Sequence, residues 1–476
     1  MKFNTSAEAE NKTENFAGGE AYKETPELEL ATMVLTSFLK DKFYTSGNEQ
    51  LENLKTLLTK VSPEFAAKTA IYARQEFGMR SISHVIAGEL AKSVKGQAWS
   101  KRFYEAVIHR PDDITEIIAY YLTQYKKPLP NSLKKGLAKA FDKFDGYQLA
   151  KYRSATKKIK LIDAVNMVHP KPTGKNSEAL KQLTENKLVS IDTWETELTK
   201  AGQKAETDEQ KEEFKKEAWV KLINEKKIGY FALLRNLRNI IEQAPEMTPK
   251  TAEMLVDENL IRKSLVLPFR FQTALKTLEK HSELPRSILI AINQAAEIAL
   301  KNVPKLLGKT LIALDCSGSM GGQPIEIGSL FASVLYKTND ADLILFSNDG
   351  LFYNPNPLDT ALSIAKQIQA KAQMGGTNFH SIFQTANKPY NRIIILSDMQ
   401  AWIGYDTPKV AFTEYKNRTK SNPSIYSFDL AGHGTIQFPE RNIYALAGFS
   451  EKIFDVMANL EQDREALINK IKSVVI

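Results

Sequence analysis

Apolar side chains return every three or four positions between about residue 27 and residue 303, which is the spacing that builds one face of a helix. Two helix starts are clear, because Thr25 precedes Pro26 and Ser62 precedes Pro63, and a hydroxyl before proline is typical of a first turn. Glycine or proline interrupts the pattern at short intervals. This part therefore predicts stacked helix pairs joined by short turns, as in HEAT or armadillo repeats.

After residue 303 the pattern changes. Short apolar runs now alternate with helical patterns, which is typical of a doubly wound α/β domain. The expected strands are 310–314, 341–346, 392–397 and 424–430, and the expected helices are 323–337, 358–371, 406–419 and 448–459, followed by a last amphipathic helix at 461–474. The expected domains are a flexible tail at 1–26, a helical-repeat module at 27–303 and the α/β domain at 304–476.

The composition is that of an ordinary soluble protein, with 43% apolar and 25% charged residues in a chain of 476. Its single cysteine, Cys316, excludes an intramolecular disulfide and a zinc site built from cysteines, and favours a reducing compartment. No apolar run is long enough to span a membrane, and residues 1–26 lack the apolar core of a signal peptide. We expect a cytoplasmic monomer with no membrane partner.

The excess of positive charge is local. The chain has a formal net charge of +8, yet residues 310–476 hold 14 Lys plus Arg against 16 Asp plus Glu. Residues 126–175 alone hold 13 Lys plus Arg against 3 Asp plus Glu. Such a stretch favours a polyanionic partner for the helical part, although solvated helix faces are the commoner origin of basic runs.

One loop carries most of the candidate chemistry. The apolar run 310–314 ends in Asp315, and Ser317 and Ser319 follow at alternate positions. Loops at the carboxyl ends of strands bind ligands in open α/β sheets, and one carboxylate with two hydroxyls is a set of hard oxygen donors suited to Mg²⁺. The alternative is that the two serines only cap the following helix.

Two later segments add oxygen donors of the same kind. Thr377 follows a pair of glycines, and Asp398 follows the apolar strand 392–397. Together with the earlier loop they resemble the metal-ion-dependent adhesion site (MIDAS) of von Willebrand factor A domains, in which three loops surround one divalent cation. The resemblance implies a cation, Mg²⁺, held directly or through water by Asp315, Ser317, Ser319 and Thr377, with Asp398 on the last loop.

The helical part has a resemblance of its own. Five short segments resemble, in the same order, segments of the Ro autoantigen family: Arg80–His84, Lys151–Arg153, Asp163–Pro172, Ala232–Leu237 and Leu267–Arg270. Members of that family join a TROVE module, which is a ring of HEAT-like helical repeats, to a von Willebrand A domain. The resemblance implies an α plus α/β fold in which an all-α repeat ring precedes a doubly wound α/β domain.

The Ro resemblance also implies a function. Ro proteins bind small noncoding Y RNAs on the outer face of the ring, and single-stranded ends of misfolded RNAs enter the central hole. In bacteria the resemblance implies a Y-like RNA that tethers an exoribonuclease such as polynucleotide phosphorylase. We therefore expect a noncatalytic RNA-binding scaffold of a ribonucleoprotein for RNA quality control. Its expected partners are Y-like RNA, structured or misfolded RNA 3′ ends and an exoribonuclease.

The family's RNA contacts fall on Lys151, Tyr152 and His169, inside the basic stretch. A lysine can neutralise a phosphate, and a histidine can hydrogen-bond or stack on a base. The family's further basic residue has no single counterpart, because the spacing is one residue longer here, so either Arg153 or Lys157 takes that role. An alternative role for His169 is to cap the helix that ends before it.

Arg80 and His84 lie four residues apart on a predicted helix, where they would line an RNA-facing surface, unless His84 is a core histidine. An enzyme is not expected, because neither a phosphate-binding loop nor a nucleophile elbow is complete. The competing function is a metal-dependent protein adhesion module. Such a module does not need the basic stretch, so nucleic acid that copurifies with the protein would distinguish the two.

Overall fold

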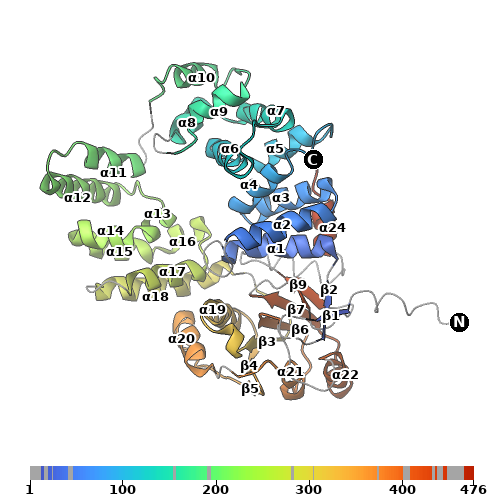
Figure 1. Cartoon of the computed structure of the whole chain (residues 1–476). Coiled ribbons are helices and arrows are strands. Elements are labelled where there is room, and N and C mark those ends of the chain that lie inside the picture. Colours follow the sequence, from blue (N-terminus) through green and yellow to red (C-terminus); the bar gives the residue numbers. More distant parts are fainter. Residues whose placement is uncertain are drawn as a thin grey trace. The chain divides into compact units, whose positions relative to one another are not determined.

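A computed structural model describes residues 12–14, 20–23, 25–40, 47–153, 157–189, 194–279, 284–303, 305–372, 375–399, 408–430, 435–436, 443–446 and 466–476. Two compact units result, namely Thr25–Glu197 with Glu465–Ile476, and Met1–Glu24 with Leu198–Arg464. Within the described residues, no helix is both long enough and apolar enough to cross a membrane. Each unit is a body of its own, and its elements are labelled in Figure 1.

The first unit is all-α. Its helices are α1 (Pro26–Lys40), α2 (Gly47–Lys60), α3 (Pro63–Glu76), α4 (Ser81–Glu89), α5 (Ser100–Val107), α6 (Pro111–Tyr125), α7 (Asn131–Ala140), α8 (Gly146–Lys151), α9 (Leu161–Val168), α10 (Ser177–Thr184) and α24 (Ala466–Lys472). The two predicted caps are confirmed, because Thr25 Oγ1 accepts a hydrogen bond from Leu28 N at 3.3 Å and Ser62 Oγ accepts one from Phe65 N at 3.1 Å.

Helices of this unit that lie two apart in the chain pack as pairs, with α4 against α6 and α5 against α7. Glycine allows the close approach at both crossings. A Cβ atom on Gly88 would lie 2.5 Å from the Tyr120 ring, and a Cβ atom on Gly136 would lie 2.1 Å from the Tyr104 ring. Helix pairs stacked on helix pairs are the arrangement that the apolar pattern predicts.

Replacing Gly136 by alanine is expected to destabilise the first unit by about 1–3 kcal/mol, because the added methyl group overlaps a fully buried ring and one of the two helices must shift. Gly174→Ala is the matched control, since nothing lies within 4 Å of the position that its Cβ would take. Urea unfolding followed by circular dichroism measures both. Equal midpoints for the two variants would contradict the close packing of α5 on α7.

The second unit joins helices to a sheet. Helix α11 (Trp194–Gln203) crosses the boundary between the units. The helices that follow are α12 (Asp208–Asn224), α13 (Tyr230–Arg235), α14 (Leu237–Gln243), α15 (Thr248–Leu255), α16 (Glu258–Ser264), α17 (Pro268–Leu278), α18 (Arg286–Ala299), α19 (Gln323–Thr338), α20 (Ala361–Lys371), α21 (His380–Thr385) and α22 (Pro408–Thr419).

The sheet of this unit has the strand order β5-β4-β3-β6-β7-β9. All neighbours are parallel except the edge strand β5, which is antiparallel to β4. The strands are β3 (Thr310–Asp315), β4 (Ala341–Phe346), β5 (Gly350–Phe352), β6 (Arg392–Ser397), β7 (Ser424–Asp429) and β9 (Ile443–Leu446).

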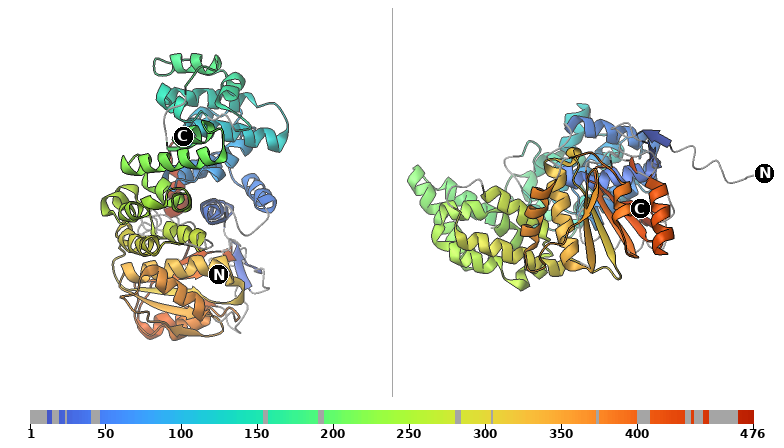
Figure 2. Two further views of the ribbon diagram at one scale, coloured as in Figure 1. Left: turned by 90° about the vertical axis from the view of Figure 1, so that its left-hand side faces the viewer. Right: turned by 90° about the horizontal axis from the view of Figure 1, so that it is seen from below.

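Helices cover both faces of this sheet (Figure 2). On one face α21 and α22 bury Phe383 and Phe412 against Ile393 and Ile395, and on the other face α19 packs on β3. Strands covered on both sides are apolar throughout, which is why β3 and β6 are recognisable in the sequence. The predicted α plus α/β fold class, with a doubly wound second part, is therefore confirmed.

The short elements were not predicted. Strands β5 and β9 and helix α21 have three to six residues, too few for a periodic pattern. The predicted helix at 448–459 lies outside the described residues, and the predicted last helix at 461–474 is described as α24, Ala466–Lys472. Two strands, β1 (Lys12–Glu14) and β2 (Glu20–Lys23), lie in the expected flexible tail, and β2 pairs with β8 (Thr435–Ile436).

Packing divides the chain at a different place from the sequence pattern, which changes after residue 303. Residues 198–303 pack with the sheet, because the Glu297 carboxylate on α18 accepts hydrogen bonds from Lys337 Nζ at 2.6 Å and from the amide of Ala361 at 2.5 Å. Lys366 on α20 likewise pairs with Glu279 at 2.6 Å. The change in hydrophobic periodicity after residue 303 shows where helices give way to alternating strands and helices. The boundary of a compact unit depends instead on which side chains contact one another.

Candidate functional site

The oxygen-rich loop follows β3 directly. Asp315 ends this central strand and is completely buried. One of its carboxylate oxygens accepts a hydrogen bond from the amide of Ser317 at 2.8 Å, and the other accepts one from the Ser397 hydroxyl at 2.6 Å. Because β3 and β6 are parallel neighbours, their two terminal loops meet at one edge of the sheet.

A third loop reaches the same edge. Ser317 and Gly375 form a parallel bridge, and the amide of Gly318 donates to the Gly375 carbonyl at 2.8 Å. This pairing holds the loop that carries Thr377, whose side chain is buried. Asn348, for which the sequence offered no signal, fixes the loop from the other side by accepting a hydrogen bond from the amide of Gly376 at 2.8 Å.

The serine hydroxyls face one another. Ser317 Oγ and Ser319 Oγ lie 3.2 Å apart, while α19 is preceded by Gly322 and has no side-chain cap. The alternative that these serines only cap the helix therefore does not describe their contacts. Within the described residues no group of three or more His, Cys, Asp or Glu side chains could hold a metal, so this candidate site is of the mixed type, with two carboxylates and three hydroxyls.

The electrostatics of the site favour a cation. Burial raises the pKa of Asp315 to about 7, the hydrogen bonds from Ser397 and Ser317 oppose this, and the charge of Asp398 adds to it. Asp398 is itself only 1% exposed. Two buried carboxylates with hydroxyls beside them are the donor chemistry of a hard divalent ion. The residues present thus fit Mg²⁺, with Asp315, Ser317, Ser319, Thr377 and Asp398 as its surroundings.

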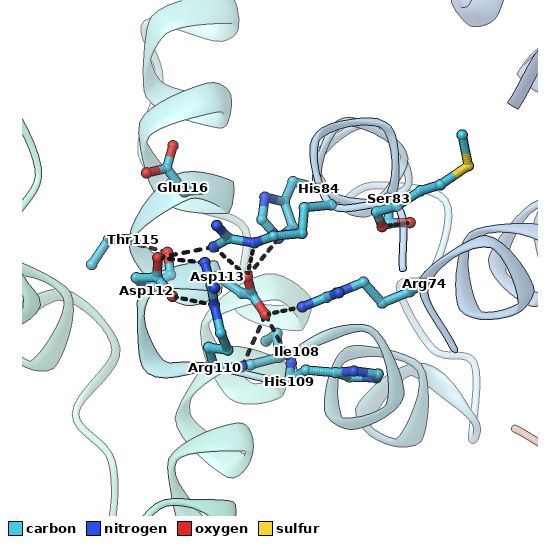
Figure 3. A network of polar contacts seen from close by, with 12 residues as sticks. Arg74, Ser83, His84, Ile108, His109, Arg110, Asp112, Asp113, Thr115 and Glu116 are labelled. Atoms are coloured by element: carbon cyan, nitrogen blue, oxygen red, sulfur yellow. Dashed lines mark hydrogen bonds and ion pairs between the residues drawn. The ribbon is translucent and has the colours of Figure 1, made fainter. Parts of the chain in front are cut away.

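A second polar centre lies in the first unit and is drawn in Figure 3. The Asp113 carboxylate, in the first turn of α6, is completely buried. It accepts hydrogen bonds from Arg74 at 3.0 Å, from Arg80 at 2.6 and 2.9 Å, and from the amides of His109 and Arg110 at 2.9 Å each. Helices α3, α4 and α6 are joined at this one side chain.

Asp112 extends the network toward the predicted RNA contacts. Its carboxylate accepts from Arg80 at 2.9 Å and from two nitrogens of Arg110 at 3.1 Å each. The Arg110 guanidinium lies 5.1 Å from the centre of the Tyr152 ring, and Lys151 Nζ lies 5.7 Å from the same ring. Arg110 thus connects the buried carboxylates to Tyr152 by a cation–π contact.

The basic neighbours of Asp113 lower its pKa. Burial alone would raise the pKa of Asp113, but His84, Arg80 and Arg74 beside it hold that pKa well below its usual range. Nε2 of His84 lies 3.1 Å from the carboxylate, and the His84 side chain is 7% exposed. Arg80 and His84, both predicted to face RNA, are therefore engaged in this network, and the core-histidine alternative describes the surroundings of His84. Their contact with RNA stays a prediction.

The remaining residues predicted to bind RNA differ in whether their side chains already contact other parts of the protein. Arg153 donates to the Leu188 carbonyl and, at 2.7 Å, to the Asn186 side chain, while Lys157 pairs with Glu116 at 2.5 Å. Lys151 and His169 are exposed. The backbone of His169 adopts φ +52° and its amide donates to the Val165 carbonyl at 2.9 Å, so the main chain ends α9 while the ring remains at the surface.

Comparison with known proteins identifies the helical part. The family model described as "TROVE domain" matches residues 32–186 and 184–302, which together are more than half of the chain. The chain belongs to the TROVE family. The predicted kinship with Ro-type proteins is thereby confirmed, and proteins of this kind bind RNA.

Two further likenesses agree with the TROVE assignment. The crystal structure of the Deinococcus radiodurans RO (RSR) protein superposes with a TM-score of 0.65 at 18% identity, covering 92% of this chain and 99% of that one, which shows a common fold. "Telomerase protein component 1" of Rattus norvegicus is 34% identical over 101 residues, and that of Mus musculus is 33% identical over 101 residues. These matches span 20% of this chain but only 4% of each relative.

The sequence contained a weak signal for the network within the TROVE module. Arg110, Pro111, Asp112 and Asp113 were recognisable as a helix start with two acids in its first turn, where acids are favoured. The pattern does not show that Asp113 is buried, because its partner Arg74 lies 39 residues earlier and reaches it only through packing.

Proposed function

We propose that this TROVE protein is a noncatalytic RNA-binding scaffold of a Ro-type ribonucleoprotein. Small noncoding Y-like RNA binds at the surface around Lys151 and His169. The observation that best supports this is that Lys151 and His169 are exposed on a module of an RNA-binding family, and that Lys151 lies beside the Tyr152 ring, which also contacts Arg110. Cations neutralise phosphates, and an aromatic ring or a guanidinium offers a face for a base.

The proposal extends to the partners of such a particle. Structured or misfolded RNA 3′ ends are the second RNA class, and an exoribonuclease, of the polynucleotide phosphorylase kind, is the protein that acts on them. This assigns RNA quality control in the cytoplasm to the particle and leaves catalysis to its partner.

The α/β domain supplies a metal-dependent adhesion site in this proposal. Asp315, Ser317, Ser319 and Thr377 hold Mg²⁺, directly or through water, with Asp398 on the last loop. A bound divalent ion offers an open position to a carboxylate of a protein partner. The second candidate function, a metal-dependent adhesion module without RNA, is favoured by this site alone and would leave Lys151 and His169 without a role.

The double substitution Lys151→Ala with His169→Ala is expected to weaken binding of RNA stem-loops of unrelated sequence to a similar degree. The slope of log Kobs against log salt should fall by about 0.9, since one phosphate contact is lost. Fluorescence anisotropy over a salt series measures both quantities. Lys250→Ala is the control for the lost charge, because Lys250 lies on α15 and donates to the Asn224 side chain at 2.7 Å.

Two results would contradict the proposal. If the double variant keeps the affinity and salt slope of the wild type, the assigned surface is wrong. If wild-type protein purified from its own cells carries no nucleic acid and binds no RNA, the adhesion module without RNA is the better function.

A further inference from the structure

The fold places two groups of cations from the basic stretch 126–175 at different ends of helix α6. Helix α6 has 15 residues and is therefore about 22 Å long at 1.5 Å per residue. Lys157 pairs with Glu116 near the start of this helix, whereas Lys126 and Lys127 follow its last residue. The cations around Tyr152 and those at 126–135 thus lie at opposite ends of α6, and the second group does not belong to the surface proposed above.

Packing brings a second turn beside Lys126 and Lys127. The Ser132 hydroxyl donates to the Ala91 carbonyl at 2.6 Å, and Lys92 Nζ lies 5.0 Å from the centre of the Tyr125 ring. The turn between α4 and α5 therefore adjoins the turn between α6 and α7. Together with the first residues of α5 and α7, the two turns carry eight cations, which we call the lysine edge: Lys92, Lys95, Lys101, Arg102, Lys126, Lys127, Lys134 and Lys135.

The two segments that form the lysine edge contain no acidic residue of their own. Residues 90–104 and 121–136 contain no Asp or Glu, and within the described chain none of the eight cations forms an ion pair. Two carboxylates border these segments: Glu105 lies one helical turn after Lys101 and Arg102 on α5, and Glu89 accepts hydrogen bonds from the hydroxyls of Tyr120 at 2.5 Å and Tyr125 at 2.6 Å. The negative charge of Glu52 also raises the pKa of Tyr125, and the Glu52 carboxylate pairs with Lys55 at 2.8 Å.

Helix stability does not explain these cations. Lys101 and Arg102 lie in the first turn of α5, and Lys134 lies near the start of α7, while neither first turn contains an acid. The amino-terminal end of a helix is the positive end of its dipole, so basic residues there are unfavourable and acidic ones are preferred. Seven of the eight cations are exposed, and like charges at this density repel one another unless an anion lies between them.

We propose that the lysine edge is a second RNA-binding surface, which contacts the phosphate backbone at the end of α6 opposite to Tyr152. The inference rests on the proposed RNA-binding function and adds a separate contact area to it. RNA fits better than a lipid surface, because no large exposed apolar side chain of the described chain lies between residues 90 and 135, and so nothing there would enter a bilayer. Backbone contacts of this kind carry no base specificity.

The test uses the full chain and one synthetic stem-loop RNA with a single-stranded 3′ tail. Lys126, Lys127, Lys134 and Lys135 are replaced together by alanine. The slope of log Kobs against log salt is expected to fall by about 3, because each phosphate contact contributes about 0.7–0.9. The matched control replaces four exposed lysines of the second unit by alanine, namely Lys211, Lys216, Lys221 and Lys227, and is expected to keep the slope.

Melting curves and vesicles complete the test. The quadruple variant should melt at or above the wild-type temperature, since repulsion is removed. If its RNA affinity and slope equal those of the control while Lys151→Ala with His169→Ala weakens binding, the lysine edge is not an RNA surface although the proposed function stands. If wild-type protein binds no RNA, both fail. Loss of binding to phosphatidylserine vesicles, with RNA binding retained, would overturn the RNA assignment of this edge.

Discussion

Asp113→Ala is expected to destabilise the first unit by about 3–5 kcal/mol, the largest loss from any single substitution in this protein that we predict. Asp113 is completely buried, and its carboxylate is the common partner of Arg74 and Arg80. Removing it takes the ion-pair partner from Arg74, whose side chain is only 8% exposed, whereas Arg80 keeps its pair with Asp112. A buried charge that has lost its partner costs far more than the pair contributed. Urea unfolding at neutral pH measures the loss.

The control for Asp113→Ala is Asp142→Ala. Asp142 pairs with Lys139 at 2.7 Å, and the two side chains are 28% and 51% exposed. A pair of this exposure contributes about 0–1 kcal/mol, so the control should unfold close to the wild type. If Asp113→Ala unfolds no earlier than Asp142→Ala, the network of Figure 3 does not hold α3, α4 and α6 together.

The lowered pKa of Asp113 predicts that the free energy of unfolding depends on pH. The pKa of Asp113 is depressed in the folded state, so the stability it contributes is present above the unfolded pKa of about 4 and is lost as the pH falls toward the lower folded value. The gap in unfolding free energy between wild type and Asp113→Asn should therefore narrow below about pH 4. A gap that stays constant from pH 7 to pH 3 would contradict this.

Asp315→Asn is expected to abolish stabilisation of the second unit by Mg²⁺. At a free Mg²⁺ concentration about 100 times its Kd, binding to the folded state alone adds about 2.7 kcal/mol to wild-type stability. The variant should gain nothing, because the amide removes the negative charge of the one carboxylate that lies at the centre of the sheet edge. Differential scanning calorimetry with Mg²⁺ and with a chelator measures the difference.

The control for this substitution is Asp340→Asn. Asp340 is exposed and comes just before β4, at the amino end of the strands and so away from the Asp315 loop. The Asp340→Asn variant should be stabilised by Mg²⁺ as much as the wild type is. A wild-type melting temperature that is indifferent to both Mg²⁺ and chelator would exclude the metal site, whatever the variant does.

These two experiments address separate parts of the protein. The Asp113 network belongs to the first unit, where Asp112 and Arg110 connect it to the ring of Tyr152. Asp315 belongs to the second unit. A loss of RNA binding in Asp113→Asn that is absent in Asp315→Asn would show that the buried carboxylate positions the proposed RNA surface.

The sequence by itself determined the elements whose causes are local. Thr25 and Ser62 cap helices because a hydroxyl reaches an amide three residues ahead, and the strand ending in Asp315 is recognisable because both of its faces are apolar. The loop chemistry around Asp315 and the likeness to Ro-type proteins follow from residues that are close in the chain. Short elements such as β5 escaped prediction because three residues show no period.

Only the tertiary structure decided how the charges are distributed. The basic stretch 126–175 reads as one patch, yet α6 places its two parts at opposite ends of a helix, and the Ser132–Ala91 hydrogen bond joins one part to cations 24 to 43 residues earlier. Arg80, predicted to contact RNA, also lies against Asp113, 33 residues away, and only packing shows this neighbour. The physical reason is that a charge is neutralised by whichever side chain lies beside it in space, and neither spacing nor composition specifies that neighbour.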